Sequence, residues 1–452
     1  MYLAYGDNLL STTMKFKEMM RITMKKIAIY SFVTGVLASS GAFAASDSIV
    51  ATSAPPQYEA PSKQARALFA GDTTTYVKCV YKVGGQDDSN PTSSWLWAKV
   101  GSNYAKLKGY WYNSMPLANM FYTEAPNAEV MNLCTSTLAA AGVSSTIVIP
   151  YASDYTLSYY YVIWNQGANQ PVVNVGGRGL DRMVVFGDSL SDTINVYNGS
   201  YGTVPNSKSW LLGHFSNGKL WHEYLSTALN LPSYVWATGN AESGEKPFFN
   251  GFGKQMDSFR DYHAHAKGYD IGKTLFTVLF GGNDFVTGGK SADEVIGQYT
   301  TQLNRLAQLG AKQVAVFRLP DFSVIPNVAK WTDADKAKLK ENSVQFNDKV
   351  EKLIAKLNAE YPQTTFYTLQ LDEAFKQVLE NSGQYGFVNK TDTCLDVSQS
   401  GYSYAVGGAA KAACKSSNAA FVFWDNMHPT TKTHGLLAEL LKAEVVRGLA
   451  AP

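Results

Sequence analysis

From Leu180 to the C-terminus, apolar runs of strand length alternate with longer amphipathic stretches. Apolar positions at helical spacing predict helices, and short continuous apolar runs predict buried strands. Strand and helix in alternation favour a parallel sheet that is covered by helices on both faces. The predicted strands are Met183–Phe186, Leu275–Phe280, Val314–Arg318, Thr365–Thr368 and Phe421–Trp424. The predicted helices include Ala292–Leu309, Asp333–Glu360 and Asp372–Glu380.

Residues 76 to 164 have a different pattern, with many aromatic and turn-forming residues between short apolar runs. This pattern predicts a small β-rich or α+β domain over residues 71–165, followed by a linker from Gln166 to Gly179 that is rich in Gly, Asn and Pro. The expected strands are Tyr76–Val83, Ser94–Val100, Thr146–Tyr151 and Tyr155–Trp164. The expected helices are Met115–Tyr122 and Glu129–Ala141.

The first 44 residues have the features of an export signal. A short basic stretch precedes the apolar run Ile27–Ser39, and a small-x-small cleavage site ends at Ala44. That run is too short to span a bilayer of about 30 Å as a mature helix. We predict cleavage after Ala44, with Met24 as an alternative start. Residues 45–70, rich in Ala, Ser, Pro and Gln, are expected to form a flexible leader.

Composition narrows the class of protein only slightly. The length of 452 residues is enough for roughly two or three domains, and we expect the larger one over residues 180–452. A net charge of +2 gives no bias toward nucleic acid. The 27 tyrosines suit lipid or carbohydrate surfaces as well as β-rich cores, because the ring is apolar and the hydroxyl is polar.

Four cysteines are present, and an even number in an exported chain predicts disulfides. Three pairings are possible. The pairing Cys79–Cys134 and Cys394–Cys414 is favoured because each pair then lies within one region of the chain. Metal binding is not expected, because the sequence has neither a CxxC motif nor a neighbouring cluster of histidines.

A candidate nucleophile follows the first predicted strand of the larger domain. The strand ends at Gly187, and Ser189 comes two residues later, where a helix start can supply backbone N–H groups to an anion. Taken alone, Ser189 is better interpreted as a helix cap, because Ser and Asp cap helices routinely. The segment Phe280-Gly281-Gly282-Asn283-Asp284 also follows a predicted strand, and Asn283 there is either an oxyanion donor or part of a turn.

Asp425 and His428 lie three positions apart after the last predicted strand. A carboxylate at that spacing can fix the imidazole tautomer and stabilise its charged form, although a lone histidine before a proline is often a turn residue. Gly239, in Ala237-Thr238-Gly239-Asn240-Ala241, would let backbone approach a ligand closely. Together these residues supply a nucleophile, three oxyanion donors and an oriented base.

These segments resemble the motif blocks of the GDSL, or SGNH, hydrolase family. The resemblance covers Leu180 to the C-terminus and implies a flavodoxin-like α/β/α sandwich. It also implies that Ser189 is the nucleophile, His428 the base and Asp425 its orienting carboxylate. By the same resemblance, the oxyanion hole consists of the Ser189 N–H, the Gly239 N–H and the Asn283 side-chain amide.

A narrower resemblance covers nearly the whole mature chain. The segments from Gly213 to Gly218 and from Asp425 to Thr431 look like those of secreted phospholipases and glycerophospholipid–cholesterol acyltransferases. The stretch from Tyr76 to Thr123 is similar to the N-terminal domain of thermolabile, lecithin-dependent haemolysins. Two positions depart from the usual glycines of this branch, Ile194 and Asn240, and Asn240 is expected to reshape the oxyanion pocket.

The narrower resemblance implies a secreted phospholipase A2 or lysophospholipase that forms an acyl-enzyme and passes the acyl group to water or to a sterol. Its expected partner is a phospholipid or lysophospholipid at a membrane surface, in peripheral contact. No cofactor, metal or nucleic acid is expected, and the chain is expected to be a monomer.

Two other functions compete with this hypothesis. One is a carbohydrate esterase of the same fold, which deacetylation of xylan or peptidoglycan would reveal. The other is a secreted lipid- or glycan-binding protein with a vestigial site, in which an aromatic face of the smaller domain is the active part. The candidate aromatics are Trp95, Trp97, Trp111 and Tyr112, and we favour their assignment to the domain core.

Overall fold

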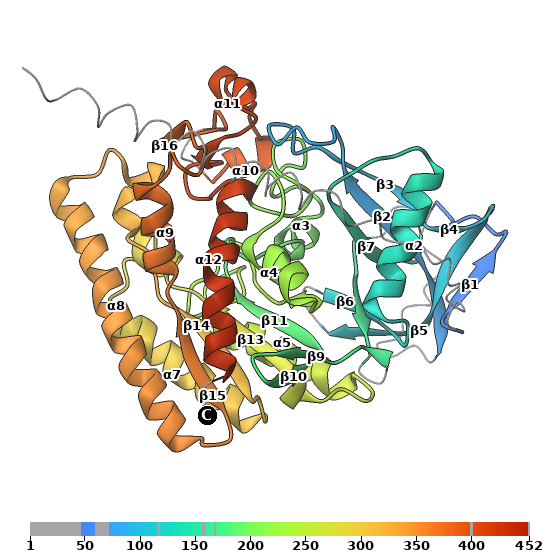
Figure 1. Ribbon diagram of the computed structural model, residues 1–452, viewed down its shortest axis with the longest axis horizontal. Coiled ribbons are helices and arrows are strands. Elements are labelled where there is room, and N and C mark those ends of the chain that lie inside the picture. Colours follow the sequence, from blue (N-terminus) through green and yellow to red (C-terminus); the bar gives the residue numbers. More distant parts are fainter. Residues whose placement is uncertain are drawn as a thin grey trace, which may run out of the picture. The chain divides into compact units, whose positions relative to one another are not determined.

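The computed structural model describes residues 47–58, 72–114, 118–155, 159–166, 169–397 and 401–450 (Figure 1). The predicted signal peptide and residues 45, 46 and 59–70 of the predicted leader lie outside the described residues. Among the helices that are described, none combines the length and the apolar character needed to cross a membrane.

The larger region is built on a five-stranded sheet in which all strands are parallel. The sheet order is β12 (Ser233–Val235), β11 (Arg182–Gly187), β13 (Thr274–Leu279), β14 (Gln313–Phe317) and β15 (Thr365–Leu369). Every residue of β11, β13 and β14 is buried, which explains why these strands are continuous apolar runs. The order 2-1-3-4-5 is the flavodoxin-like one, so the predicted fold class is confirmed.

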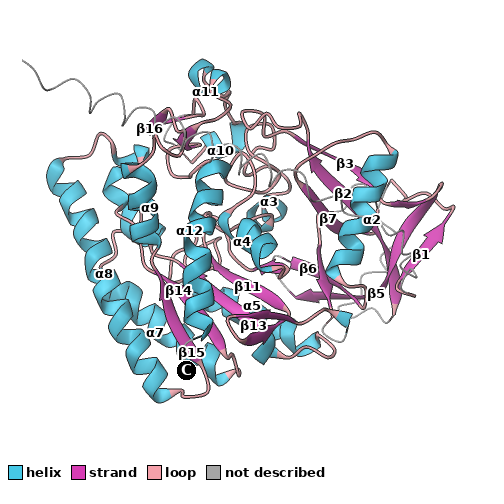
Figure 2. Cartoon of the chain, viewed as in Figure 1, coloured by secondary structure: helices cyan, strands magenta, loops and turns pink. Residues whose placement is uncertain are grey.

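Helices cover both faces of this sheet (Figure 2). The helices α4 (Trp221–Leu229), α9 (Leu371–Glu380) and α12 (Thr431–Ala450) pack together on one face. The helices α5 (Phe252–His265), α7 (Ala292–Gln308) and α8 (Asp333–Glu360) pack on the other. Local sequence fixes where two of them begin, because Ser291 caps α7 by accepting the Glu294 N–H and Thr332 caps α8 by accepting the Asp335 N–H.

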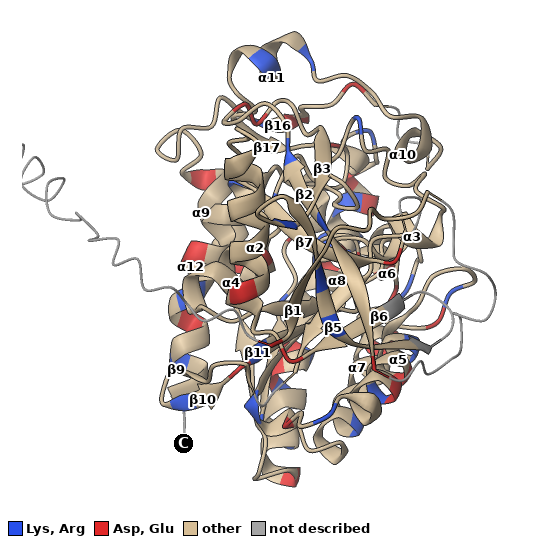
Figure 3. Ribbon diagram, turned by 90° about the vertical axis from the view of Figure 1, so that its right-hand side faces the viewer, with Lys and Arg blue, Asp and Glu red and all other residues tan. Residues whose placement is uncertain are grey.

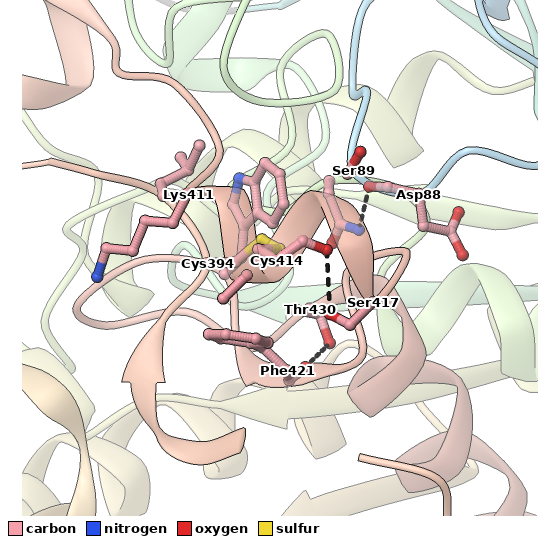
Figure 4. The surroundings of a disulfide bond; sticks show 12 residues. Asp88, Ser89, Cys394, Lys411, Cys414, Ser417, Phe421 and Thr430 are labelled. Atoms are coloured by element: carbon pink, nitrogen blue, oxygen red, sulfur yellow. Dashed lines mark hydrogen bonds between the residues drawn. A yellow bond between two sulfur atoms is a disulfide. The ribbon is translucent and has the colours of Figure 1, made fainter. Parts of the chain in front are cut away.

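The prediction that Phe421–Trp424 is a strand of the main sheet is wrong. Residues Phe421–Phe423 form β17, which pairs with β16 (Asn389–Thr393) in a separate two-stranded sheet. The run is apolar because a separate cluster buries it, in which Phe421 and Trp424 pack with Trp210. The disulfide Cys394–Cys414 belongs to the same cluster and ties the end of β16 to α11 (Ala412–Ser416), as Figure 4 shows.

The smaller region contains an eight-stranded sheet. Its main path runs β3 (Ser93–Trp97), β2 (Thr73–Lys82), β5 (Asn103–Ser114), β6 (Ala118–Thr123) and β8 (Val162–Asn165). The strands β1 (Ile49–Thr52), β4 (Lys99–Val100) and β7 (Val148–Ser153) pair alongside. The helix α2 (Asn127–Ala140) packs on it, and the disulfide Cys79–Cys134 joins β2 to this helix.

Three local predictions in and beside this region are wrong. The expected helix Met115–Tyr122 is in fact the strand β6 over its described residues, because its aromatic positions pair across to β5, with Phe121 opposite Trp111. Part of the expected flexible leader, Ile49–Thr52, is the strand β1 paired with β5. The expected linker holds the hairpin β9 (Val173–Val175) and β10 (Arg178–Leu180).

A buried guanidinium lies where the two sheets meet. Arg182, the first residue of β11, is fully buried, and its Nη1 donates to the Asn165 carbonyl of β8 at 3.1 Å. Its Nε donates to Asp181 Oδ1 at 2.7 Å, and its guanidinium carbon lies 4.5 Å from the centre of the Trp164 ring. Tyr122 of β6 adds a contact between the regions, since its hydroxyl donates to the Tyr262 carbonyl at 2.9 Å.

We expect Arg182→Met to lower the free energy of unfolding by about 3–5 kcal/mol, because the carboxylate of the buried Asp181 would lose its partner. Urea denaturation measures this change. The matched control is Arg260→Met, which removes a half-exposed arginine with two surface ion pairs and should cost less than about 1 kcal/mol. Equal midpoints for the two variants would contradict the assignment.

Candidate active site

Ser189 follows the carboxyl end of β11, an interior strand of the larger sheet. The strand β11 ends at Gly187, where an added Cβ would come within 2.8 Å of the Leu279 carbonyl, so the tight packing there requires glycine. A turn follows, in which the Asp188 carbonyl accepts the N–H groups of Ser191 and Asp192, both at 3.0 Å. This turn leaves the Ser189 side chain 8% exposed, at the wall of a cavity.

The structure brings Ser189, His428 and Asp425 together. The distance from His428 Nε2 to Ser189 Oγ is 2.7 Å, although the two residues are 239 positions apart. On the other side of the ring, His428 Nδ1 lies 2.8 Å from Asp425 Oδ1 and 2.9 Å from Oδ2. These contacts leave Nε2 as the acceptor for the serine proton and Nδ1 as the donor to the carboxylate.

Asp425 is completely buried yet surrounded by donors. Its Oδ1 accepts the backbone N–H of Met427 at 2.9 Å and of His428 at 3.0 Å, and its Oδ2 accepts the indole N–H of Trp210 at 2.8 Å. Burial alone would raise the pKa of this carboxyl, but His428 and the three N–H donors outweigh burial and hold the pKa below its ordinary value. The carboxylate is therefore charged at neutral pH.

The segment from Gly213 to Gly218, which only the narrower resemblance singles out, holds the loop of His428 in place. Ser216 Oγ donates to the Pro429 carbonyl at 2.9 Å, and Asn217 Oδ1 accepts the Thr431 N–H at 2.7 Å. The Phe215 ring lies 5.2 Å from the ring of His428. The segment thus fixes the backbone that follows His428 in the chain. This role explains why Ser216 and Asn217 are polar although they are buried.

Asn283 lies on α6 (Gly282–Val286), at the end of β13, and it lines the same cavity as Ser189. Its Nδ2 donates one hydrogen to the Ala241 carbonyl at 2.9 Å. An amide nitrogen carries two hydrogens, so this bond fixes the side chain and leaves the second hydrogen for a ligand.

The prediction that Gly239 supplies an oxyanion donor is not supported by the geometry. Its N–H donates to Asp192 Oδ2 at 2.8 Å, so the donor is already used. Gly239 has a packing role instead, because an added Cβ would lie 2.6 Å from the Phe215 ring. The next residue, Asn240, lines the cavity at φ 62°, and its N–H donates no hydrogen bond to any other described residue.

Asp192 is a residue whose importance sequence reasoning missed. It is fully buried and accepts four backbone N–H groups, from Ile194, Asn195, Val196 and Gly239. Burial raises the pKa of this carboxyl to about 6 against the effect of those donors, so it is charged at neutral pH. Asp192 therefore connects the loop after Ser189 to the Gly239 turn.

The cavity has a volume of about 270 Å³, and its lining combines the apolar residues Phe215, Phe249 and Met427 with the polar residues Ser189, Asn240, Asn283 and His428. Tyr404 also lines it, with its hydroxyl 3.3 Å from Asp425 Oδ1. No cluster of His, Cys, Asp and Glu side chains among the described residues has the arrangement to hold a metal ion.

The aromatic residues weighed as a binding face lie partly in the interior. Trp95 and Trp97 are half-buried and flank the ammonium of the buried Lys78, at 5.0 and 5.5 Å from their ring centres. Trp111 and Tyr112 are half-buried as well, and Tyr112 stacks on His265 of α5 with ring centres 3.7 Å apart. This packing agrees with a structural role for all four.

Two family models match the chain. The model described as GDSL-like Lipase/Acylhydrolase matches residues 183–441, and the model described as Vibrio dual lipase/transferase, N-terminal domain, matches residues 49–166. The chain is 38% identical over 374 residues to thermolabile hemolysin of Vibrio parahaemolyticus, covering 81% of this chain and 87% of the relative.

Two further relatives match a smaller share of the chain. The secreted effector protein SseJ of Salmonella typhimurium is 28% identical over 281 residues, covering 60% of this chain and 65% of the relative. Phosphatidylcholine-sterol acyltransferase of Aeromonas hydrophila is 26% identical over 305 residues, covering 57% of this chain and 88% of the relative.

The bond from Trp210 to Asp425 gives a test of the geometry. We expect Trp210→Phe to lower kcat/KM for a short p-nitrophenyl ester by about tenfold, because a charged acceptor loses one donor. The pKa of Asp425 should rise, so the acid limb of the pH profile should move to higher pH. Trp331→Phe, a change at a half-buried tryptophan outside the cavity lining, is the control.

The same variant changes how stability depends on pH. Because the folded pKa of Asp425 lies below its unfolded value of about 3.9, its charge stabilises the fold above that pH, and this contribution is lost as the pH falls through the folded pKa. In Trp210→Phe the loss should begin at a higher pH, as measured by thermal unfolding between pH 3 and 6. Unchanged acid limbs in both measurements would contradict the role of Trp210.

Proposed function

The chain belongs to the GDSL-like lipase/acylhydrolase family, and from that premise we propose that it hydrolyses acyl ester bonds of glycerophospholipids and lysophospholipids through an acyl-enzyme on Ser189. The observation that carries the proposal is the contact of 2.7 Å between His428 Nε2 and Ser189 Oγ, with Asp425 on the opposite ring nitrogen. A serine within reach of an oriented base is the requirement for nucleophilic acyl transfer.

In the first half-reaction, His428 takes the Ser189 proton as Oγ forms a bond to the ester carbonyl carbon. The tetrahedral intermediate then collapses, the carbon–oxygen bond to the glycerol breaks, and His428 returns the proton to the leaving oxygen. In the second half-reaction, water attacks the acyl-serine by the same route and releases a fatty acid. Asp425 stabilises the charged imidazole throughout.

The oxyanion is proposed to be bound by the Ser189 N–H, the Asn283 side-chain amide and the Asn240 N–H. Asn240 replaces Gly239 in this assignment because the Gly239 N–H is held by Asp192. The N–H groups of Ser189 and Asn240 both donate to no other described residue, and both residues line the cavity. Donors fixed in advance stabilise the developing charge without reorganisation at the moment of reaction.

The substrate class follows from the cavity and the relatives together. The lining residues Val196, Val204, Phe215, Phe249 and Met427 suit an acyl chain. One relative is named as an acyltransferase from phosphatidylcholine to sterol, so a sterol hydroxyl is proposed as a second acyl acceptor beside water.

We propose that the protein acts outside the cytoplasm. Disulfides Cys79–Cys134 and Cys394–Cys414 are typical of exported proteins, and relatives carry the names of a hemolysin and a secreted effector. Export through the predicted signal peptide and a monomeric state belong to the same proposal.

The nucleophile is tested by Ser189→Ala, which should abolish release of fatty acid from defined phosphatidylcholine while leaving the thermal unfolding midpoint unchanged. Product analysis by mass spectrometry, with and without cholesterol, identifies the acyl acceptor. Ser416→Ala, at an exposed serine of α11, is the matched control. Residual fatty-acid release by Ser189→Ala, or release of acetate from xylan in preference to phosphatidylcholine by the wild type, would refute the proposal.

The oxyanion assignment is tested by Asn283→Ala, which should lower kcat by about 10²–10³ with little change in KM, because one preorganised donor is lost. Steady-state kinetics on a soluble short-chain ester measure both constants. Asn342→Ala, at a half-buried asparagine of α8 outside the cavity, should leave both constants close to the wild-type values. A change confined to KM would assign Asn283 to substrate binding instead.

A further inference from the structure

Three aromatic side chains stand out because water surrounds them almost completely. Phe248 is 98% exposed, Tyr201 is 83% exposed and Tyr402 is 74% exposed. We call these three residues the aromatic rim. Large aromatic rings usually contribute to a protein by burial, so rings this exposed contribute little to the stability of the fold.

The aromatic rim lies on chain segments that also supply the lining of the catalytic cavity. Each of its residues lies within three positions of a residue that lines the cavity, with Phe248 beside Phe249, Tyr402 beside Gly401, and Tyr201 three residues before Val204. None of the three lines the cavity itself. The rim therefore projects from the loops that form the walls.

Two of these loops are joined directly. The Asn206 N–H donates to the Tyr404 carbonyl at 2.8 Å, and Asn206 Nδ2 donates to the Ala405 carbonyl at 2.9 Å. These bonds tie the loop after α3 (Asn195–Gly199) to α10 (Ser403–Val406), and Figure 3 shows the two short helices on the same side of the molecule. Tyr201 and Tyr402 are thus held on adjacent loops at one edge of the cavity.

The backbone gives a second, independent observation. Tyr201 has φ 56° and Phe248 has φ 67°, in the left-handed region that favours Gly and Asn and disfavours aromatic side chains. The Phe248 side chain is almost entirely in water, so its packing offsets little of this strain, while the Tyr201 ring has an aromatic neighbour in Tyr159 at 6.2 Å between ring centres. Strain that side-chain packing does little to offset motivates a functional hypothesis for these positions.

We propose that the aromatic rim inserts into the surface of a phospholipid membrane and holds the catalytic cavity against it. This inference rests on the proposed function, because a phospholipid substrate reaches the enzyme in a bilayer. Single rings on separate loops can enter a fluid interface independently, whereas they form no continuous surface for a folded partner. Tyrosine suits the interfacial layer because its ring is apolar and its hydroxyl remains hydrated.

Charge near the rim agrees with a neutral lipid surface. Lys246, two residues before Phe248, pairs with Glu242 at 2.9 Å, so its charge is compensated. Insertion should therefore depend on apolar contact and should persist at high salt, unlike attraction to anionic lipid.

The test is flotation with vesicles of dioleoylphosphatidylcholine, using protein that carries Ser189→Ala so that the lipid stays intact. Replacing all three rim residues with Asn should lower the membrane-bound partition at least tenfold, in 0.1 M and in 0.5 M NaCl alike. Asn is favoured at the two left-handed positions, so the thermal unfolding midpoint should stay the same or rise. The single variant Phe248→Asn should lower the partition in the same direction.

The matched control replaces three exposed valines outside the cavity lining, as Val344→Gln, Val388→Thr and Val446→Gln, which should change the partition less than twofold. In protein with Ser189 intact, the rim substitutions should lower fatty-acid release from vesicles at least tenfold more than turnover of a short soluble ester.

Equal flotation of the rim variant and its parent, or absence of flotation by the parent, would overturn the inference. Binding that requires anionic lipid or vanishes at 0.5 M NaCl would overturn it too. Because flotation needs no catalysis, these outcomes are separate from failure of the proposed function, which would appear as a wild-type protein that releases no fatty acid from phosphatidylcholine.

Discussion

The arrangement of the site depends on one buried charge, the carboxylate of Asp425. A buried carboxylate is stable only when its oxygens accept hydrogen bonds, and here these donors come from two distant places in the chain. Its own loop supplies the backbone N–H groups of Met427 and His428 and the His428 ring, and Trp210 supplies its indole N–H. Satisfying this charge therefore fixes the histidine, and the position of the histidine fixes where Ser189 must lie.

The regular part of the fold could be predicted from sequence because its pattern is local. The helix Asp333–Glu360 has the predicted bounds, and four strands of the main sheet lie where short strand-like runs indicated, three of them fully buried. The failures occur where partners at a distance decide the structure. The strand β12 has only three residues, too few to give a recognisable pattern. Phe421–Phe423 is apolar because it packs in a separate cluster, which the local pattern does not reveal. Residues 118–123 become a strand because β5 pairs with them.

The same distinction between local pattern and distant partners applies to the residues of the site. Ser189, Asp425 and His428 were predicted from residue type and spacing, and they lie within hydrogen-bonding distance, while their catalytic roles stay predictions. The Gly239 assignment is unsupported, because a motif does not say where a backbone N–H points, and Asp192 accepts this one. Trp210 was missed since its indole acts across 215 positions, with no spacing that sequence could show.

Hydrogen bonding and backbone strain are distributed differently around the cavity. Near Ser189 the two buried carboxylates are held by donors, with Asp192 accepting four backbone N–H groups and Asp425 three N–H groups. Phe248 lies outside that network of hydrogen bonds. It adopts an unfavourable backbone conformation and exposes its ring to water. Phe248 is the neighbour in sequence of Phe249, which lines the cavity. The proposed lipid contact would therefore be made next to the catalytic centre by a residue that takes no part in the hydrogen bonds of that centre.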